Sequence, residues 1–301
     1  MSDTLYILKA HPAEILALDL ESGVIATVVD GPTGVPDGIQ VDGQSGAIYW
    51  TNMGAWPQSG EAFLHADGSI ERCDLSGGGH SVLVGQGAIV TPKQLQLDAE
   101  EGRLYWCDRE GMAVMTSRVD GGDHRALLRT GQWPRDSGDV MRHCVGIALD
   151  KRNRHIYWTQ KGPPDGGLGR IFRMGLELPP GSTADTRDDV ELLIDHLPEP
   201  IDLEIDHAHG QLYWTDRGDP AVSGNSVNRA DITLEGLANH KVLATGLHEG
   251  IGLALDLKRG RAFVGDLSGA IRILSISDDR MTTAHELSAP ITGLAYLHST
   301  D

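Results

Sequence analysis

The sequence predicts an all-β protein, a six-bladed β-propeller with four antiparallel strands in each blade. Two observations carry this prediction. A Tyr-Trp pair recurs four times in the 301 residues, and with a degenerate fifth copy the intervals are about 50 to 56 residues, which is typical of a repeat architecture. Each copy follows a segment in which apolar and other residues alternate, and a period of two predicts strand rather than helix.

The first strand of each unit is this alternating segment, which ends in Asp. The five copies occupy residues 38–42, 94–98, 146–150, 202–206 and 252–256. The second strand carries the aromatic pair, and its copies occupy residues 48–52, 104–108, 156–160, 212–216 and, in degenerate form, 262–266. A short polar turn between the two predicts a β-hairpin.

The third strand of each unit shares an arginine, and a glycine-rich turn and a short fourth strand follow it. The arginines are Arg72, Arg118, Arg173, Arg229 and Arg272. Four antiparallel strands in a unit of this length correspond to one propeller blade.

The two ends of the chain predict the remaining blade. Residues 5–8 read as an aromatic strand with no alternating segment before it, and residues 293–297 read as an alternating segment with no aromatic strand after it. We expect the C-terminal strand to become the innermost strand of the N-terminal blade, so that the ring closes and leaves no open sheet edge there. Residues 1–301 are thus expected to form a single domain.

These repeats resemble the six-bladed propellers of the YWTD, or low-density-lipoprotein-receptor class B, family over nearly the whole chain. The resemblance rests on the Tyr-Trp pair, the alternating segment before it and the arginine after it. It implies extracellular protein-binding modules as the best-known relatives. More distant six-bladed propellers include lactonases and strictosidine synthase-like enzymes, whose sites lie at the mouth of the central channel.

Composition narrows the function classes. The net charge is -18, with 43 acidic and 25 basic residues, which argues against nucleic acid as a partner. No apolar run is long enough to span a membrane. Three cysteines and the lack of a signal-peptide pattern at the start predict a cytoplasmic protein. No phosphate-binding glycine loop or dinucleotide fingerprint is present, so no nucleotide cofactor is expected.

The repeated aromatic residues are expected to be structural, because a ring needs similar wedges between all blades. The resemblance implies that Asp108, Asp216 and Asp266, which follow the aromatic pair, tie neighbouring blades together. The repeated arginines are expected to do the same.

Function is expected where the repeats differ, and loop length is the first difference. Long insertions occupy residues 53–68, 130–142, 161–169 and 217–226, all on connections that reach one face of a propeller. Trp56 and Trp133 lie in two of them, and each is either a lid over a pocket or an anchor on its own blade. Residues 179–189 should lie on the opposite face.

The second difference lies at the start of the innermost strands. Most of them begin with glycine, whereas Gln94 and Asp202 break this pattern, and Glu204 places a further carboxylate near the axis. A carboxylate there is costly to desolvate unless it is paired or bound to a metal. Other polar residues expected around the same mouth are Asp37, Lys93, His143, Glu199, His248 and Glu249.

Three readings of this mouth stay open. In the first, the carboxylates are solvated. In the second, they are paired with Lys93. In the third, one divalent ion is held by a ligand set of four residues, Asp37, Glu199, Asp202 and Glu249. Such oxygen ligands favour calcium, magnesium or manganese, and a histidine would permit zinc.

If the mouth is catalytic, His143 is the expected proton carrier, with Asp202 or Glu249 as its orienting group or as the base. Substrate contacts are then expected from Trp56, Lys93, Gln94, Trp133, Glu204 and His248. The favoured function is a small-molecule enzyme of the hydrolase, lyase or isomerase type. The alternative is a non-catalytic propeller that binds a protein or peptide.

Overall fold

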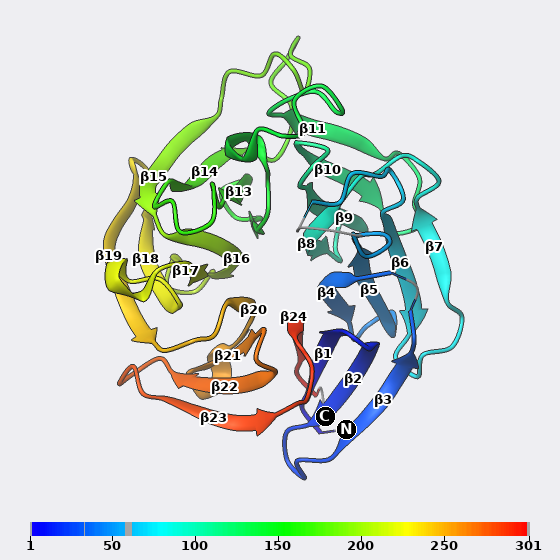
Figure 1. Ribbon diagram of the computed structural model, residues 1–301, viewed down its shortest axis with the longest axis vertical. Coiled ribbons are helices and arrows are strands. Elements are labelled where there is room, and N and C mark those ends of the chain that lie inside the picture. Colours follow the sequence, from blue (N-terminus) through cyan, green and yellow to red (C-terminus); the bar gives the residue numbers. More distant parts are fainter. Residues whose placement is uncertain (1, 33, 58–61, 300–301) are drawn as a thin grey trace.

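The computed structural model describes residues 2–32, 34–57 and 62–299, and it is a ring of six four-stranded antiparallel sheets (Figure 1). We number the blades along the chain from the N-terminus. Each sheet is given below from the axis of the ring outward. Within the described residues, no helix is long and apolar enough to cross a membrane.

Blade 1 joins the two ends of the chain, and blades 2 and 3 follow it. Blade 1 consists of β24 (Ile291–Leu297), β1 (Thr4–Ala10), β2 (Ala13–Asp19) and β3 (Ile25–Asp30). Blade 2 consists of β4 (Pro36–Asp42), β5 (Ala47–Asn52), β6 (Ser69–Asp74) and β7 (Ser81–Val84). Blade 3 consists of β8 (Pro92–Asp98), β9 (Arg103–Asp108), β10 (Ala113–Arg118) and β11 (Arg125–Arg129).

Blades 4 to 6 complete the ring, and in the described part of the chain three short 3₁₀ turns lie between strands. Blade 4 consists of β12 (Ile147–Asp150), β13 (His155–Gln160), β14 (Gly169–Gly175) and β15 (Glu191–Leu197). Blade 5 consists of β16 (Glu199–Asp206), β17 (Gln211–Arg217), β18 (Ser226–Thr233) and β19 (Gly236–Thr245). Blade 6 consists of β20 (Gly250–Asp256), β21 (Arg261–Asp266), β22 (Ala270–Ser275) and β23 (Met281–Glu286). The turns are η1 (Val140–Arg142), η2 (Pro220–Val222) and η3 (Leu257–Arg259).

Ring closure follows the sequence prediction. Strand β24 pairs antiparallel with β1, with Leu294 opposite Ile7, and it lies on the axis side of blade 1 (Figure 1). The long insertions also lie on the expected connections, between β5 and β6, β11 and β12, β13 and β14, and β17 and β18. Residues 58–61 of the first insertion lie outside the described part of the chain.

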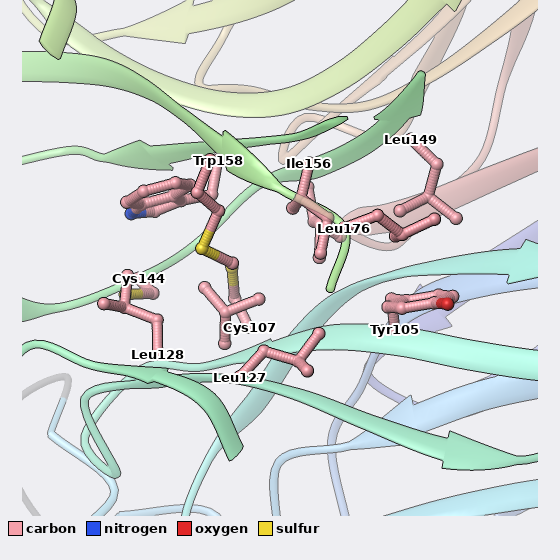
Figure 2. Packing of buried hydrophobic residues seen from close by; sticks show 12 residues of the cluster. Tyr105, Cys107, Leu127, Leu128, Cys144, Leu149, Ile156, Trp158 and Leu176 are labelled. Carbon is pink, nitrogen blue, oxygen red and sulfur yellow. The ribbon is translucent and has the colours of Figure 1, made fainter. Parts of the chain in front are cut away.

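The core consists of wedges between neighbouring blades. The tryptophans of the repeat are fully buried, as expected, and one wedge joins Tyr105 and Cys107 of β9 to Ile156 and Trp158 of β13. Figure 2 shows Cys107 and Cys144 in this wedge, packed with Leu128 and Trp158. The cysteines Cys73, Cys107 and Cys144 are all free and buried.

The ties between blades differ in detail from the expectation. Asp108 accepts hydrogen bonds from the backbone N–H groups of Val90 and Thr91, so it holds the segment that enters its own blade. The direct tie to the next blade is the threonine after the aromatic pair, because Thr159 donates to the carbonyl oxygen of Ile201 at 3.0 Å. Thr215 donates in the same way to Ile251 at 2.8 Å.

The arginines of the third strands do not share one role. Arg173 donates to the carbonyl oxygens of Thr233 and Leu234 in blade 5, and it is an inter-blade tie as expected. Arg118 and Arg272 instead bind Asp120 and Asp266 within their own blades, which corrects the expectation for these two. Each guanidinium group is thus engaged by a carboxylate of its own blade.

Candidate functional site

A repeated β-bulge positions the polar residues around the axis. In blades 2, 3 and 6 the pairing of the innermost strand with its neighbour skips two residues after the first pair, and in blade 5 it does so after the second. A bulge redirects side chains that regular alternation would place on the two faces of the sheet. The skipped residues include Asp37, Lys93, Gln94 and Asp202, four of the residues that the sequence analysis selected. A proline is the first residue of two of these strands, at residues 36 and 92, and the second residue of β16, at residue 200, and it is the sequence signal for the irregular start.

Asp37, Lys93 and Gln94 form one buried cluster. The Lys93 ammonium group pairs with the Asp37 carboxylate and lies 3.2 Å from the Met53 sulfur. Gln94 donates from Nε2 to Asp37 Oδ1 at 3.0 Å and to the carbonyl oxygen of Thr292 at 3.2 Å. Burial raises the pKa of Asp37 and lowers the pKa of Lys93, because both charges leave water, and their mutual attraction opposes these shifts. Lys93 is thus paired with Asp37, whereas the sequence analysis considered it as a partner of Asp202 and Glu204.

Asp202 and Glu204 lie farther along β16 and bind other strands. The Asp202 carboxylate accepts the backbone N–H of Leu203 and that of Leu253 on β20, each at 2.9 Å. Burial, with the nearby charge of Glu204, raises the pKa of Asp202 well above its usual range. Glu204 accepts a hydrogen bond of 3.1 Å from Gln96 Nε2 on β8, and burial raises the pKa of Glu204 to about 7.

A cavity of about 230 Å³ opens where three of the long loops meet. Ala62, Val140 and Gly162, which line it, come from the β5–β6, β11–β12 and β13–β14 connections. Its polar groups come from four further lining residues, which are Arg109, Glu110, His143 and Lys161. The grouping agrees with the expectation that the long loops share one face of the ring.

His143 is one of the titratable residues that line this cavity. It follows η1, is 9% exposed, and its Nε2 lies 2.8 Å from the carbonyl oxygen of Ser137. A carbonyl oxygen only accepts, so Nε2 carries the proton and Nδ1 is the acceptor of the neutral ring. Burial lowers the pKa of His143, the charges of Arg109 and Lys161 lower it further, and Ser137 and Glu110 oppose the shift. The ring is therefore neutral, and able to accept a proton, near pH 7.

Two ion pairs face His143 from neighbouring blades. Arg109 binds Glu110 with both Nε and Nη2, at 2.9 and 2.6 Å, and this pair outweighs burial and lowers the pKa of Glu110. Lys161 donates to Glu199 at 2.8 Å. The structure thus places Glu110, rather than Asp202 or Glu249, beside His143, because Asp202 is held by backbone groups and Glu249 pairs with Arg217.

Sequence reasoning missed Arg109, Glu110 and Lys161. They directly follow the aromatic strands β9 and β13, at positions where the other blades carry residues such as Met53 and Leu267. Comparing the residues just after each aromatic strand, rather than only those before it, would have identified them.

The four expected metal ligands are not gathered into one cluster. Asp37 pairs with Lys93, Glu199 with Lys161 and Glu249 with Arg217, while Asp202 accepts two backbone N–H groups. Across the described ranges, no three His, Cys, Asp or Glu side chains are arranged to hold an ion. These residues do not fit a divalent ion as one ligand set, and an ion bound to this protein stays a sequence prediction.

The other expected substrate contacts lie outside the cavity. Trp56 is 52% exposed and meets His11 edge-on at 6.0 Å, and Trp133 is 40% exposed. Neither indole lines the His143 cavity. His248 is exposed and its backbone N–H donates to Asp266 at 3.2 Å. Lys93 and Gln94 are buried near the axis, and Glu204 is partly buried.

No protein-family model matches the chain. It is 46% identical over 282 residues to "Low-density lipoprotein receptor-related protein 1" of Pyricularia oryzae, covering 90% of this chain and 88% of that protein. It is 35% identical over 294 residues to "3-hydroxyacyl-CoA dehydrogenase-like protein LAM1" of Cochliobolus heterostrophus. That alignment covers 94% of this chain but only 60% of LAM1.

Solved structures share the fold at low sequence identity. A chain of the nidogen/laminin complex matches with a TM-score of 0.75 and 19% identity, covering 98% of both chains. A gluconolactonase of Xanthomonas campestris matches with a TM-score of 0.65 and 13% identity, covering 95% of this chain and 89% of the other. A luciferin-regenerating enzyme matches with a TM-score of 0.60 and 11% identity, covering 87% and 79%.

These neighbours include both enzymes and binding proteins, so they identify the scaffold and not the activity. Together with the repeated Tyr-Trp strands and the closed ring, the full-length relative shows the family. The chain belongs to the six-bladed YWTD, or low-density-lipoprotein-receptor class B, family of β-propellers.

Proposed function

We propose that this protein is a small-molecule enzyme of the hydrolase type, acting on a compact ester or lactone in the His143 cavity. The observation that carries the proposal is a buried histidine that is kept neutral and whose Nε2 is fixed by the Ser137 carbonyl oxygen. Such a ring is a suitable general base near pH 7. The cavity, at about 230 Å³, suits a small substrate.

The charge balance of the cavity favours an uncharged polar substrate. Arg109 is matched by Glu110 and Lys161 by Glu199, so the two cations are neutralised locally. The Lys161 ammonium group has three N–H donors, and Glu199 takes one of them. A substrate carbonyl oxygen is the kind of acceptor that these donors suit.

In the proposed reaction, His143 Nδ1 removes a proton from water as the water oxygen attacks the carbonyl carbon. Donors from Lys161 and Arg109 stabilise the charge that develops on the carbonyl oxygen. When the tetrahedral intermediate collapses, the bond to the leaving oxygen breaks and the His143 imidazolium returns the proton to it. The products are a carboxylic acid and an alcohol, or one hydroxy acid from a lactone.

The test uses the purified full chain with δ-valerolactone and p-nitrophenyl acetate as probes. We expect His143→Gln to lose about 10² to 10⁴ in kcat/KM, the usual contribution of general-base catalysis. The wild-type rate should rise with pH through a pKa below 6.5, and this rise should disappear in the variant. The matched control is His124→Gln, at an exposed position outside the cavity. Absence of hydrolysis by the wild type, or equal rates for both variants, would refute the proposal.

A second candidate, a non-catalytic protein-binding module, is favoured by a different observation. Large exposed apolar side chains lie on the long loops of the same face, namely Trp56, Leu64, Trp133, Leu168 and Val222. Exposed aromatic residues of this kind often anchor protein partners. If this candidate holds, Trp56→Ser with Trp133→Ser abolishes capture of a partner, whereas His143→Gln leaves capture unchanged. Retained capture by the double tryptophan variant would exclude it.

A further inference from the structure

A second cavity, of about 360 Å³, lies between blades 3 and 4. Leu128 of β11 lines one side and Trp158, Arg170 and Phe172 of β13 and β14 line the other. Residues of the β11–β12 loop, including Arg142, complete it. It shares no lining residue with the His143 cavity, so it requires its own explanation.

One wall of this second cavity is aromatic. The Trp158 and Phe172 rings stack with centroids 5.2 Å apart and planes 12° apart. The Arg170 guanidinium group lies over the Phe172 ring, 5.2 Å from its centroid. With Leu128 opposite, the wall offers a flat apolar surface beside a cation.

The same wall carries two buried N–H donors without a partner. Trp158 is 1% exposed and its Nε1 has no acceptor, and Arg170 Nε is buried and likewise unpaired. A buried unpaired donor costs about 1 to 3 kcal/mol. Trp50 and Trp106 also keep an unpaired Nε1, so an unpaired indole N–H is shared with other blades of the repeat. What is particular to blade 4 is the second donor and the cavity beside both.

A change in the repeat alters the polar groups on this wall. In blade 5, Asp216 accepts a hydrogen bond of 3.3 Å from the Trp214 indole. In blade 4 the corresponding residue is Gln160, and its Oε1 accepts 2.7 Å from Arg170 Nη2 instead. The substitution therefore removes a negative charge beside Trp158 and provides an acceptor for Arg170. A carboxylate at this position does not by itself pair the indole, because Trp106 Nε1 is unpaired although Asp108 is present.

The charge of the second cavity favours an anion. Arg142 pairs with Asp139 at 2.9 Å, which leaves that pair neutral. Arg170 binds the Met141 carbonyl oxygen and Gln160, and within the described ranges no carboxylate pairs with it. The Arg170 guanidinium group therefore gives this cavity a positive charge, although the chain as a whole has a net charge of -18.

We propose that this second cavity is a binding site for a small planar carboxylate, such as an aromatic acid. The carboxylate oxygens supply the acceptors that Arg170 Nε and Trp158 Nε1 lack, and the ring packs against Phe172 and Leu128. Charge-assisted hydrogen bonds to a guanidinium group are about twice as strong as neutral ones. The site is independent of the hydrolase reaction proposed for His143.

The probe is benzoate, titrated into the full chain by isothermal calorimetry, with benzyl alcohol as the uncharged analogue. We expect saturable benzoate binding and at least about tenfold weaker binding to Arg170→Lys, which keeps the charge but loses Nε–H. Trp158→Phe, which keeps the aromatic surface and loses only the indole donor, should weaken binding in the same direction. Arg152→Lys, at an exposed position, is the matched control and should bind like the wild type.

Melting curves of each variant confirm that the ring is intact before its affinity is compared. Benzoate affinity should be the same in His143→Gln, which separates this site from the proposed active site. Three results would overturn the proposal: no saturable binding to the wild type, equal affinity for benzyl alcohol, or loss of binding in His143→Gln with retention in Arg170→Lys.

Discussion

Three carboxyl groups illustrate how single residues make the stability of this fold depend on pH. Burial raises the pKa of Asp108 to about 6, that of Glu204 to about 7 and that of Asp216 to about 8. A raised pKa means that the folded state binds a proton more tightly than the unfolded chain does. These residues therefore stabilise the protein when protonated and lose that contribution as the pH rises through the folded-state value.

Glu204 offers the cleanest test at this scale. Its contribution should be fully present below pH 4.5, the ordinary glutamate value, and lost as the pH rises to about 7. Glu204→Gln mimics the neutral acid and keeps the acceptor for Gln96, so it should melt above the wild type at pH 8, by roughly 2 °C for a gain on the order of 1 kcal/mol. At pH 4.5 the two should melt together.

The measurement is thermal unfolding followed by circular dichroism across this pH range. Glu101→Gln, at an exposed position, is the control and should show no pH-dependent difference from the wild type. A melting difference between Glu204→Gln and the wild type that stays constant from pH 4.5 to 8 would contradict the assignment.

At the scale of the element, the innermost strands are shaped by close approach to one another. A Cβ on Gly146 would lie 1.7 Å from the carbonyl oxygen of Ile201 on β16, and one on Gly293 would lie 2.3 Å from that of Asp37 on β4. Backbone atoms cannot move aside as a flexible side chain can, so glycine is required at these starts for reasons of space. The glycine pattern in the sequence predicted this crowding.

Gly146→Ala should consequently destabilise the protein by about 3 kcal/mol, because the added methyl group pushes blades 4 and 5 apart and disturbs the Thr159 hydrogen bond to Ile201. Urea unfolding followed by tryptophan fluorescence measures the loss. Gly138→Ala is the matched control, since a Cβ there meets nothing within 4 Å, and it should remain within about 1 kcal/mol of the wild type. Equal stability of the two variants would show that the inner strands are not in tight contact.

The whole molecule depends on the pairing of its two ends. Strand β24 covers the inner edge of β1, and Leu294, which is 3% exposed, packs with Leu5 and Phe263 in the wedge between blades 1 and 6. If β24 does not dock, that wedge opens and β1 becomes an exposed sheet edge, which promotes aggregation.

Leu294→Asp should therefore cost more than about 4 kcal/mol, because it places an unpaired charge in the wedge that closes the ring. Size-exclusion chromatography should show aggregation, and circular dichroism should show a much lower melting temperature. Ala284→Asp, on the exposed outer strand β23, should change stability by less than about 0.5 kcal/mol. A folded, monomeric Leu294→Asp protein with the wild-type melting temperature would contradict closure by this strand.

The sequence by itself determined the ring: the number of blades, the order of strands, the closing strand and the face that carries the long loops. These follow from a period of about 50 to 56 residues and from alternation within each unit, which are local properties of the chain. It also identified His143 and the polar residues that interrupt the glycine pattern.

Only the tertiary structure decided which of these residues meet. Arg109 and Glu110 follow β9, His143 precedes β12 and Lys161 follows β13, so their common cavity exists only because blades 3 and 4 pack side by side. The same packing gave each expected metal ligand a separate partner, such as Lys161 for Glu199. A repeat fixes the path of the backbone, whereas the pairing of charges across blades depends on distances of a few ångströms between side chains far apart in sequence, and no local pattern encodes those distances.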